Sequence, residues 1–179
     1  MELVGRRRGR PLWLIRHGES TWNAIGRMQR GISHPPLTAR GTTQAYAAGY
    51  GLRGKHISRI ITSDAVRARQ TAHAMATVLG VEAVVDGRLR ERGWSTHGAL
   101  VEARSRGPER LEDPTPRVRS VLLDIAAMDG TTAVVTHGDI VCAILDLLAP
   151  REPATRQWSS GTEVPNGVPI GVNLRRLAR

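Results

Sequence analysis

Residues 12–21 read LWLIRHGEST, a run of four apolar residues followed directly by Arg16 and His17. Such a run is typical of a strand buried on both faces of a sheet, and Gly18 suits the turn that would end it. A second β-branched run, residues 131–136 (TTAVVT), is likewise followed by a histidine and a glycine. Two buried strands that each end in a histidine indicate a polar site shared between their ends.

The composition fits one globular domain over residues 1–179, with 40% hydrophobic residues and a mean hydropathy of −0.27. A chain of this length buries about two-thirds of its surface on folding. Residues 1–10 are basic, and we expect them to be flexible. The apolar run that follows is too short for a signal peptide or a membrane span, so we predict a cytoplasmic protein without membrane association.

The formal net charge of +10 raises the question of a nucleic-acid partner. Nearly all of this charge is arginine, spread along the chain, and there are no phenylalanines and only 2 tyrosines for base stacking. Arginine also suits planar, bidentate recognition of phosphate. We therefore expect a small phosphorylated substrate and no nucleic acid.

Strand-like and helix-like segments alternate along the chain. We predict strands over residues 11–15, 59–62, 81–85 and 131–136, and helices over residues 38–52, 65–79, about 118–125 and 139–148. Thr38 suits a helix N-cap, and Gly80 suits a helix end. The alternation predicts an α/β three-layer sandwich with a mainly parallel central sheet flanked by helices.

Two segments do not follow this alternation. Residues from about 92 to 116 are rich in Gly, Arg, Glu and Pro and show little periodicity, and we expect them to form a small cap region. Residues 168–174 follow an Asn-Gly turn signal and should add one or two edge strands.

In a parallel sheet, ligands bind outside the carboxyl ends of the strands. His17, Ser63 and His137 each follow a predicted strand, and Arg67 would lie on the first turn of the next helix. Arginines, imidazoles and helix N-termini around one edge are suited to binding phosphate. Four other histidines are expected to be surface or structural residues: His34, His56, His73 and His97.

Five ordered blocks resemble the signature segments of the histidine phosphatase superfamily, which includes the cofactor-dependent phosphoglycerate mutases. They are RHGESTWN (16–23), PLTARGTTQA (36–45), TSDAVRARQTA (62–72), LRERG (89–93) and VVTHG (134–138). RHG alone would be a weak signal, but five blocks in the family's order make a strong one. Two positions depart from the family's pattern, His34 and His97, and neither belongs to the phosphate site.

The resemblance implies a role for each matching residue. His17 would be the nucleophile that carries phosphorus as a phosphohistidine, and Glu91 would protonate the leaving oxygen. The phosphate would be held by Arg16, Asn23, Arg67, His137 and Gly138. Neither a metal nor another cofactor is implied. We expect the nearby cations to lower the pKa of Glu91 in the free protein.

Three activities remain open at this point. Only residues 92–136 separate Glu91 from His137, which leaves room for a small cap, and an open site admits water. This favours a phosphatase over a phosphoglycerate mutase-type phosphotransferase. The third possibility is a phosphate-binding or phosphoprotein-binding module without catalysis. The natural substrate and the oligomeric state do not follow from the sequence.

Overall fold

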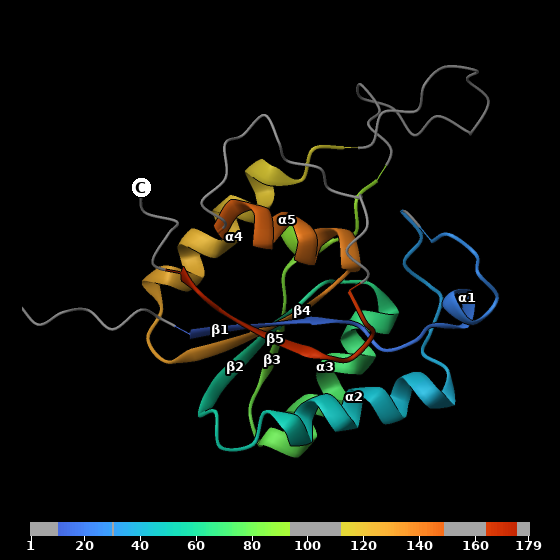
Figure 1. Cartoon of the computed structure of the whole chain (residues 1–179), viewed down its shortest axis with the longest axis horizontal. Coiled ribbons are helices and arrows are strands. Elements are labelled where there is room, and N and C mark those ends of the chain that lie inside the picture. The colour runs from blue at the N-terminus through green and yellow to red at the C-terminus, as the bar shows by residue number, and fades with distance from the viewer. Residues whose placement is uncertain (1–10, 30, 94–111, 149–163, 175–179) are drawn as a thin grey trace, which may run out of the picture.

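The computed structural model describes residues 11–29, 31–93, 112–148 and 164–174, and a five-stranded sheet lies at its centre (Figure 1). Its strands are β1 (Pro11–Arg16), β2 (Ile57–Thr62), β3 (Ala83–Val85), β4 (Thr131–Thr136) and β5 (Pro169–Asn173). They lie in the order β3-β2-β4-β1-β5, and every neighbouring pair is parallel except β1 with β5. The predicted, mainly parallel sheet is confirmed.

Helices cover both faces of this sheet. They are α1 (Thr21–Ala24), α2 (Ala39–Gly51), α3 (Val66–Leu79), α4 (Thr115–Ala127) and α5 (Gly138–Leu148), with a 3-10 turn η1 (Gly87–Leu89). In Figure 1, α4 and α5 lie above the sheet, whereas α2 and α3 lie below it. Each side has its own apolar core, centred on residues such as Leu122 and Ile144 above and Ile60 and Met75 below. The three-layer sandwich is therefore also confirmed.

The observed elements differ from the predicted ones in detail. β2 begins at Ile57, two residues earlier than predicted, and β3 begins at Ala83, two residues later. The tail forms one edge strand in the described residues. The helix α1 was not predicted, since a single turn is too short for apolar periodicity, and a capping box between Ser20 and Asn23 holds it instead. Segments 1–10 and 94–111, which include most of the expected cap, lie outside the described residues.

The loop after β1 is pressed against the start of α2. A Cβ atom at Gly18 would overlap the carbonyl oxygen of Gly41, and a Cβ atom at Gly41 would overlap the carbonyl of Glu19. The side chain of Thr38, which accepts a hydrogen bond from Gly41 N at 2.9 Å, caps α2 at this contact. The closeness of the two backbones fixes the loop that carries His17.

Gly18→Ala should therefore destabilise the protein strongly. Overpacking commonly costs about 1–3 kcal/mol, and backbone atoms cannot move aside as a flexible side chain would, so we expect a loss of about 3 kcal/mol or more. Urea unfolding would measure it. Gly51→Ala, at a helical position with open space around it, is the matched control and should cost nothing. Equal stability of the two variants would contradict the close approach.

Candidate active site

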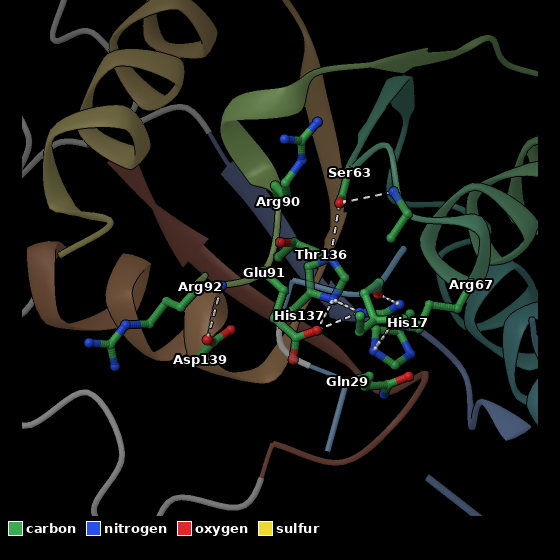
Figure 2. A network of polar contacts seen from close by, with 12 residues as sticks. His17, Gln29, Ser63, Arg67, Arg90, Glu91, Arg92, Thr136, His137 and Asp139 are labelled. Atoms are coloured by element: carbon green, nitrogen blue, oxygen red, sulfur yellow. Dashed lines mark hydrogen bonds and ion pairs between the residues drawn. The ribbon is translucent and has the colours of Figure 1, made fainter. Parts of the chain in front are cut away.

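The carboxyl ends of β1, β2 and β4 bring their following residues together, as Figure 2 shows. His17 and His137 are buried, 1% and 0% exposed, and their rings stand edge to face with centroids 5.2 Å apart. Arg67 extends toward them from α3, and Glu91 approaches from the opposite side. The structure thus gathers the two histidines, the arginine and the carboxyl group that the sequence singled out.

The tautomer of His17 follows from its hydrogen bonds. Its Nδ1 lies 2.7 Å from the carbonyl oxygen of Gly18, which can only accept, so Nδ1 carries the proton. Nε2 is then unprotonated, and its lone pair accepts a hydrogen bond from Arg67 Nε at 3.2 Å. Burial lowers the pKa of His17 to about 3, and the charge of Arg67 adds to this effect. The ring is therefore neutral and has its nucleophilic nitrogen turned toward the site.

His137 is neutral as well. Arg67 Nη2 lies 3.3 Å from its Nδ1 and can only donate, so Nδ1 accepts and Nε2 donates to Ser63 Oγ at 2.9 Å. Burial lowers the pKa of His137 well below its usual range, and the neighbouring His17 and Arg67 lower it further. Ser63 fixes the ring at the end of β2.

These two pKa shifts predict a loss of stability in acid. Below about pH 6.5 a histidine in the unfolded chain becomes protonated, whereas His17 and His137 in the folded site stay neutral. The free energy of unfolding therefore falls by up to about 1.4 kcal/mol for each histidine with each pH unit of acidification. For His17 the fall continues until about pH 3. Glu91, with a raised pKa, acts in the opposite direction over its own titration range.

The His17→Gln variant isolates the contribution of one histidine. Urea unfolding of wild type and variant at pH 7, 6 and 5 should show that the wild type loses more stability than the variant as the pH falls. A difference between them that does not change with pH would contradict a buried, neutral His17.

Arg67 connects all parts of the site. It is 1% exposed, and its guanidinium donates to Ile32 O at 2.8 Å and to Glu91 Oε2 at 2.5 Å as well as to His17. A buried guanidinium needs such partners, because an uncompensated charge away from water is costly. These partners fix the orientation of the planar guanidinium, and phosphate oxygens would have to replace some of them to be bound by it in a bidentate manner.

Glu91 differs from the expectation. Burial raises the pKa of this carboxyl group, the charge of Asp139 raises it further, and together they outweigh the lowering by Arg67. The expected lowering is therefore wrong, because the sequence showed the cations around Glu91 but not its burial. A raised pKa favours the protonated form, which a proton donor needs.

Arg16 and Asn23 line a polar cavity of about 290 Å³ that also reaches Glu91 and Gln29. Arg16 Nη1 donates to Val164 O at 2.8 Å, whereas its buried Nε finds no hydrogen-bond partner among the described residues. The amide oxygen of Asn23 is occupied by Ser20, at 3.1 Å from N and 3.0 Å from Oγ. Among the described residues, Arg16 Nε is thus a buried donor without a partner, which an anion could satisfy only if the surrounding side chains moved.

Gly138 and a second cavity complete the surroundings. A Cβ atom at Gly138 would stand 3.5 Å from Arg16 Cδ, so its missing side chain leaves space beside the guanidinium. A second cavity, of about 280 Å³, is also lined by Glu91 and is bordered by an ion pair between Arg90 and Asp64. Glu91 thus contributes to the lining of two cavities.

Sequence reasoning missed several supports of the site. Thr71 accepts from Gly18 N at 3.0 Å, and Asn166 Nδ2 donates to His17 O at 2.7 Å. Thr71 could have been found, because it lies four residues after Arg67 on the same helix face. Asn166 belongs to the Asn-Gly turn signal before residues 168–174, but that signal indicates a turn and not a contact with His17. Three of the histidines expected to be surface or structural residues are exposed, namely His34, His56 and His73, while His97 lies outside the described residues.

Two further observations concern the described part of the chain. No group of three or more His, Cys, Asp or Glu side chains there is arranged to hold a metal ion. The helices in these ranges include none with the length and apolarity needed to cross a membrane.

The fold and the site define an α/β protein with a buried histidine pair and a polar cavity, lined by arginines and Glu91, at the carboxyl end of its sheet. The family model of the histidine phosphatase superfamily (branch 1) matches residues 12–164. The chain belongs to this superfamily.

Curated relatives and solved structures agree with this membership. Probable phosphoglycerate mutase GpmB of Klebsiella pneumoniae strain 342 is 48% identical over 80 residues, 45% of this chain and 37% of that protein. GpmB of Photorhabdus laumondii is 43% identical over 94 residues, 52% of this chain and 41% of that protein. The matched segments thus span less than half of these relatives.

Among solved structures, mycobacterial glucosyl-3-phosphoglycerate phosphatase in complex with VO3 superposes with a TM-score of 0.75 and 25% identity, covering 90% of both chains. Bacillus stearothermophilus YhfR has a TM-score of 0.73 and 24% identity, covering 90% of this chain and 89% of its own, and shows the shared fold.

Proposed function

We propose that this chain is a metal-independent phosphomonoester hydrolase that acts on a small phosphorylated metabolite through a phosphohistidine at His17. The observation that carries the proposal is the state of His17: buried, neutral and with its Nε2 lone pair directed at Arg67. A neutral imidazole nitrogen is nucleophilic near pH 7, and the P–N bond that it forms is labile enough to be broken again.

In the first step, Nε2 of His17 attacks phosphorus, the bond from phosphorus to the leaving oxygen breaks, and Glu91 gives that oxygen its proton. Arg16, Arg67, His137 and Asn23 would stabilise the negative charge on the other phosphoryl oxygens. Two observations support this role. The pKa of Glu91 is raised, and its side chain lines two cavities of the site.

In the second step, water attacks the phosphohistidine and the P–N bond breaks. Glu91, now a carboxylate, takes a proton from the attacking water, and inorganic phosphate leaves. The acid and the base are then the same group, as a two-step displacement through one site requires.

A phosphotransferase of the mutase type is the second candidate, supported by the similarity to proteins named probable phosphoglycerate mutase. A phosphatase transfers the phosphoryl group to water, whereas a mutase-type phosphotransferase transfers it to an alcohol. Against a mutase stands the short segment between Glu91 and His137, which limits how far the site can be closed against water.

Hydrolysis of p-nitrophenyl phosphate in the presence of EDTA tests the proposal. We expect one inorganic phosphate for each p-nitrophenol, with or without an added alcohol such as glycerate. Phosphate appearing on the alcohol instead would indicate a mutase. Tight phosphate binding without turnover would indicate a binding module, and inhibition by EDTA would contradict metal independence.

Glu91→Gln tests the general acid. The variant should lower kcat by about 10²-fold or more for an alkyl phosphate, whose leaving alkoxide needs a proton, and much less for p-nitrophenyl phosphate, whose phenolate is stable. Both substrates are measured with wild type and variant. Glu82→Gln, in the segment before β3, is the control. Equal losses on the two substrates would show that Glu91 does not protonate the leaving group.

A further inference from the structure

The side chain of Arg117, on α4, holds the backbone of the loop that carries Glu91. Its Nη1 donates to the carbonyl oxygens of Arg88 at 2.6 Å and Arg90 at 2.7 Å, and its Nη2 lies 3.5 Å from the carbonyl oxygen of Glu91. Nε and Nη2 also donate to the carboxylate of Glu112, at 2.6 Å and 3.1 Å. All five N–H donors of a guanidinium thus have an acceptor here.

These contacts complete a row of anchored carbonyl groups. Thr136 Oγ1 on β4 donates to the carbonyl oxygen of Leu89 at 2.7 Å, so the carbonyls of residues 88–91 are all held by side chains from α4 and β4. The carboxyl group of Glu91 is held at its other end by Arg67, at 2.5 Å. The place of the carboxyl group therefore depends on its backbone anchors as well as on Arg67.

We propose that Arg117 is a positioning residue for Glu91, fixing the backbone of the acid so that its carboxyl group reaches the leaving oxygen. This inference rests on the proposed function. Among the described residues, Arg117 forms no hydrogen bond with His17, His137 or Arg67, so its hydrogen bonds act on the site through the Glu91 loop. Its charge also lowers the pKa of His137, an effect that Arg117→Lys keeps and Arg117→Met removes.

The expected effect is selective. A displacement of about 1 Å can cost about 10²-fold in rate, so Arg117→Met should lower kcat for an alkyl phosphate by about 10- to 100-fold. For p-nitrophenyl phosphate, which needs little help from an acid, the loss should stay within about 3-fold. Inhibition by inorganic phosphate should not change, because the phosphate-binding side chains stay in place. Arg117→Lys should resemble Arg117→Met, because an ammonium keeps the charge but lacks the planar fork.

Arg88→Met is the matched control. Arg88 also joins this loop to α4, through Asp124 at 2.7 Å and Ser120 at 2.9 Å, but its side chain does not hold the carbonyls around Glu91. Arg88→Met should leave unchanged the ratio of kcat for the alkyl phosphate to kcat for p-nitrophenyl phosphate. If Arg117→Met does not fold, Glu112→Gln replaces it, since this change weakens the ionic partner of Arg117 and should shift the ratio in the same direction.

The deciding measurement is a double-mutant cycle. A residue that acts through Glu91 has nothing left to position in the Glu91→Gln background, so Arg117→Met should cause no further selective loss there. The same selective loss in both backgrounds, or an equal loss on both substrates in the wild-type background, would overturn the inference. A wild-type protein that hydrolyses neither substrate would instead overturn the proposed function.

Discussion

His17→Ala should abolish turnover of every phosphomonoester, with a loss of about 10³-fold or more in kcat, because no other group can form the covalent intermediate. The variant should still bind phosphate, since Arg16, Arg67 and His137 remain. His17 is buried and accepts a hydrogen bond from Arg67 Nε, so truncation removes the nucleophile and one partner of Arg67, while the contacts of Arg67 with Ile32 and Glu91 remain. Steady-state kinetics with p-nitrophenyl phosphate and an alkyl phosphate would measure the loss.

The matched control is His73→Ala, on an exposed histidine of α3 outside the site, which should retain wild-type kinetics. Circular dichroism would show that both variants keep the fold, and calorimetric titration with inorganic phosphate would show that both still bind it. Substantial turnover in His17→Ala, on either substrate, would contradict the assignment of the nucleophile.

Arg67→Lys should lower kcat/KM by about 10²-fold or more, although the charge is kept. The guanidinium donates hydrogen bonds to His17, Glu91 and the carbonyl oxygen of Ile32 at the same time. An ammonium group cannot donate in three coplanar directions. The buried network should also weaken, because removing one partner leaves the others unpaired, so the thermal midpoint should fall.

Arg69→Lys provides the comparison, two residues along α3 and exposed. It should leave both the kinetics and the thermal midpoint unchanged. Wild-type kinetics in Arg67→Lys would exclude bidentate phosphate binding by Arg67, and a loss confined to stability would reduce Arg67 to a structural role.

Much of the fold could be predicted, because the central strands are clear apolar runs and helix ends are marked by residues such as glycine. The run 131–136 is fully buried between β1 and β2, and Gly80 ends α3 with a φ of 66°, as its position suggested. The errors lie where tertiary contacts decide the structure. The helix α1 is one turn held by Ser20 and Asn23, and the ends of β2 and β3 depend on pairing with their neighbours.

The site was predictable in its members but not in its electrostatics. The order of strands and helices placed the residues after β1, β2 and β4 at one edge, and the family resemblance added Glu91. Burial reverses what charge alone implies for Glu91, whose pKa it raises beside a guanidinium. For both histidines, burial and the neighbouring positive charges lower the pKa together. Supports such as Asn166 come from distant segments, and their contacts with the site leave no local pattern.

The central claim is a phosphoryl group carried on His17, and rapid-quench trapping tests it most directly. The protein is mixed with ³²P-labelled substrate, quenched within one turnover, and the labelled peptide is mapped. We predict an acid-labile, base-stable label on the peptide that contains residues 12–21, present in wild type, accumulating in Glu91→Gln with p-nitrophenyl phosphate and absent in His17→Ala. Label on another residue, or turnover without any labelled intermediate, would contradict the claim.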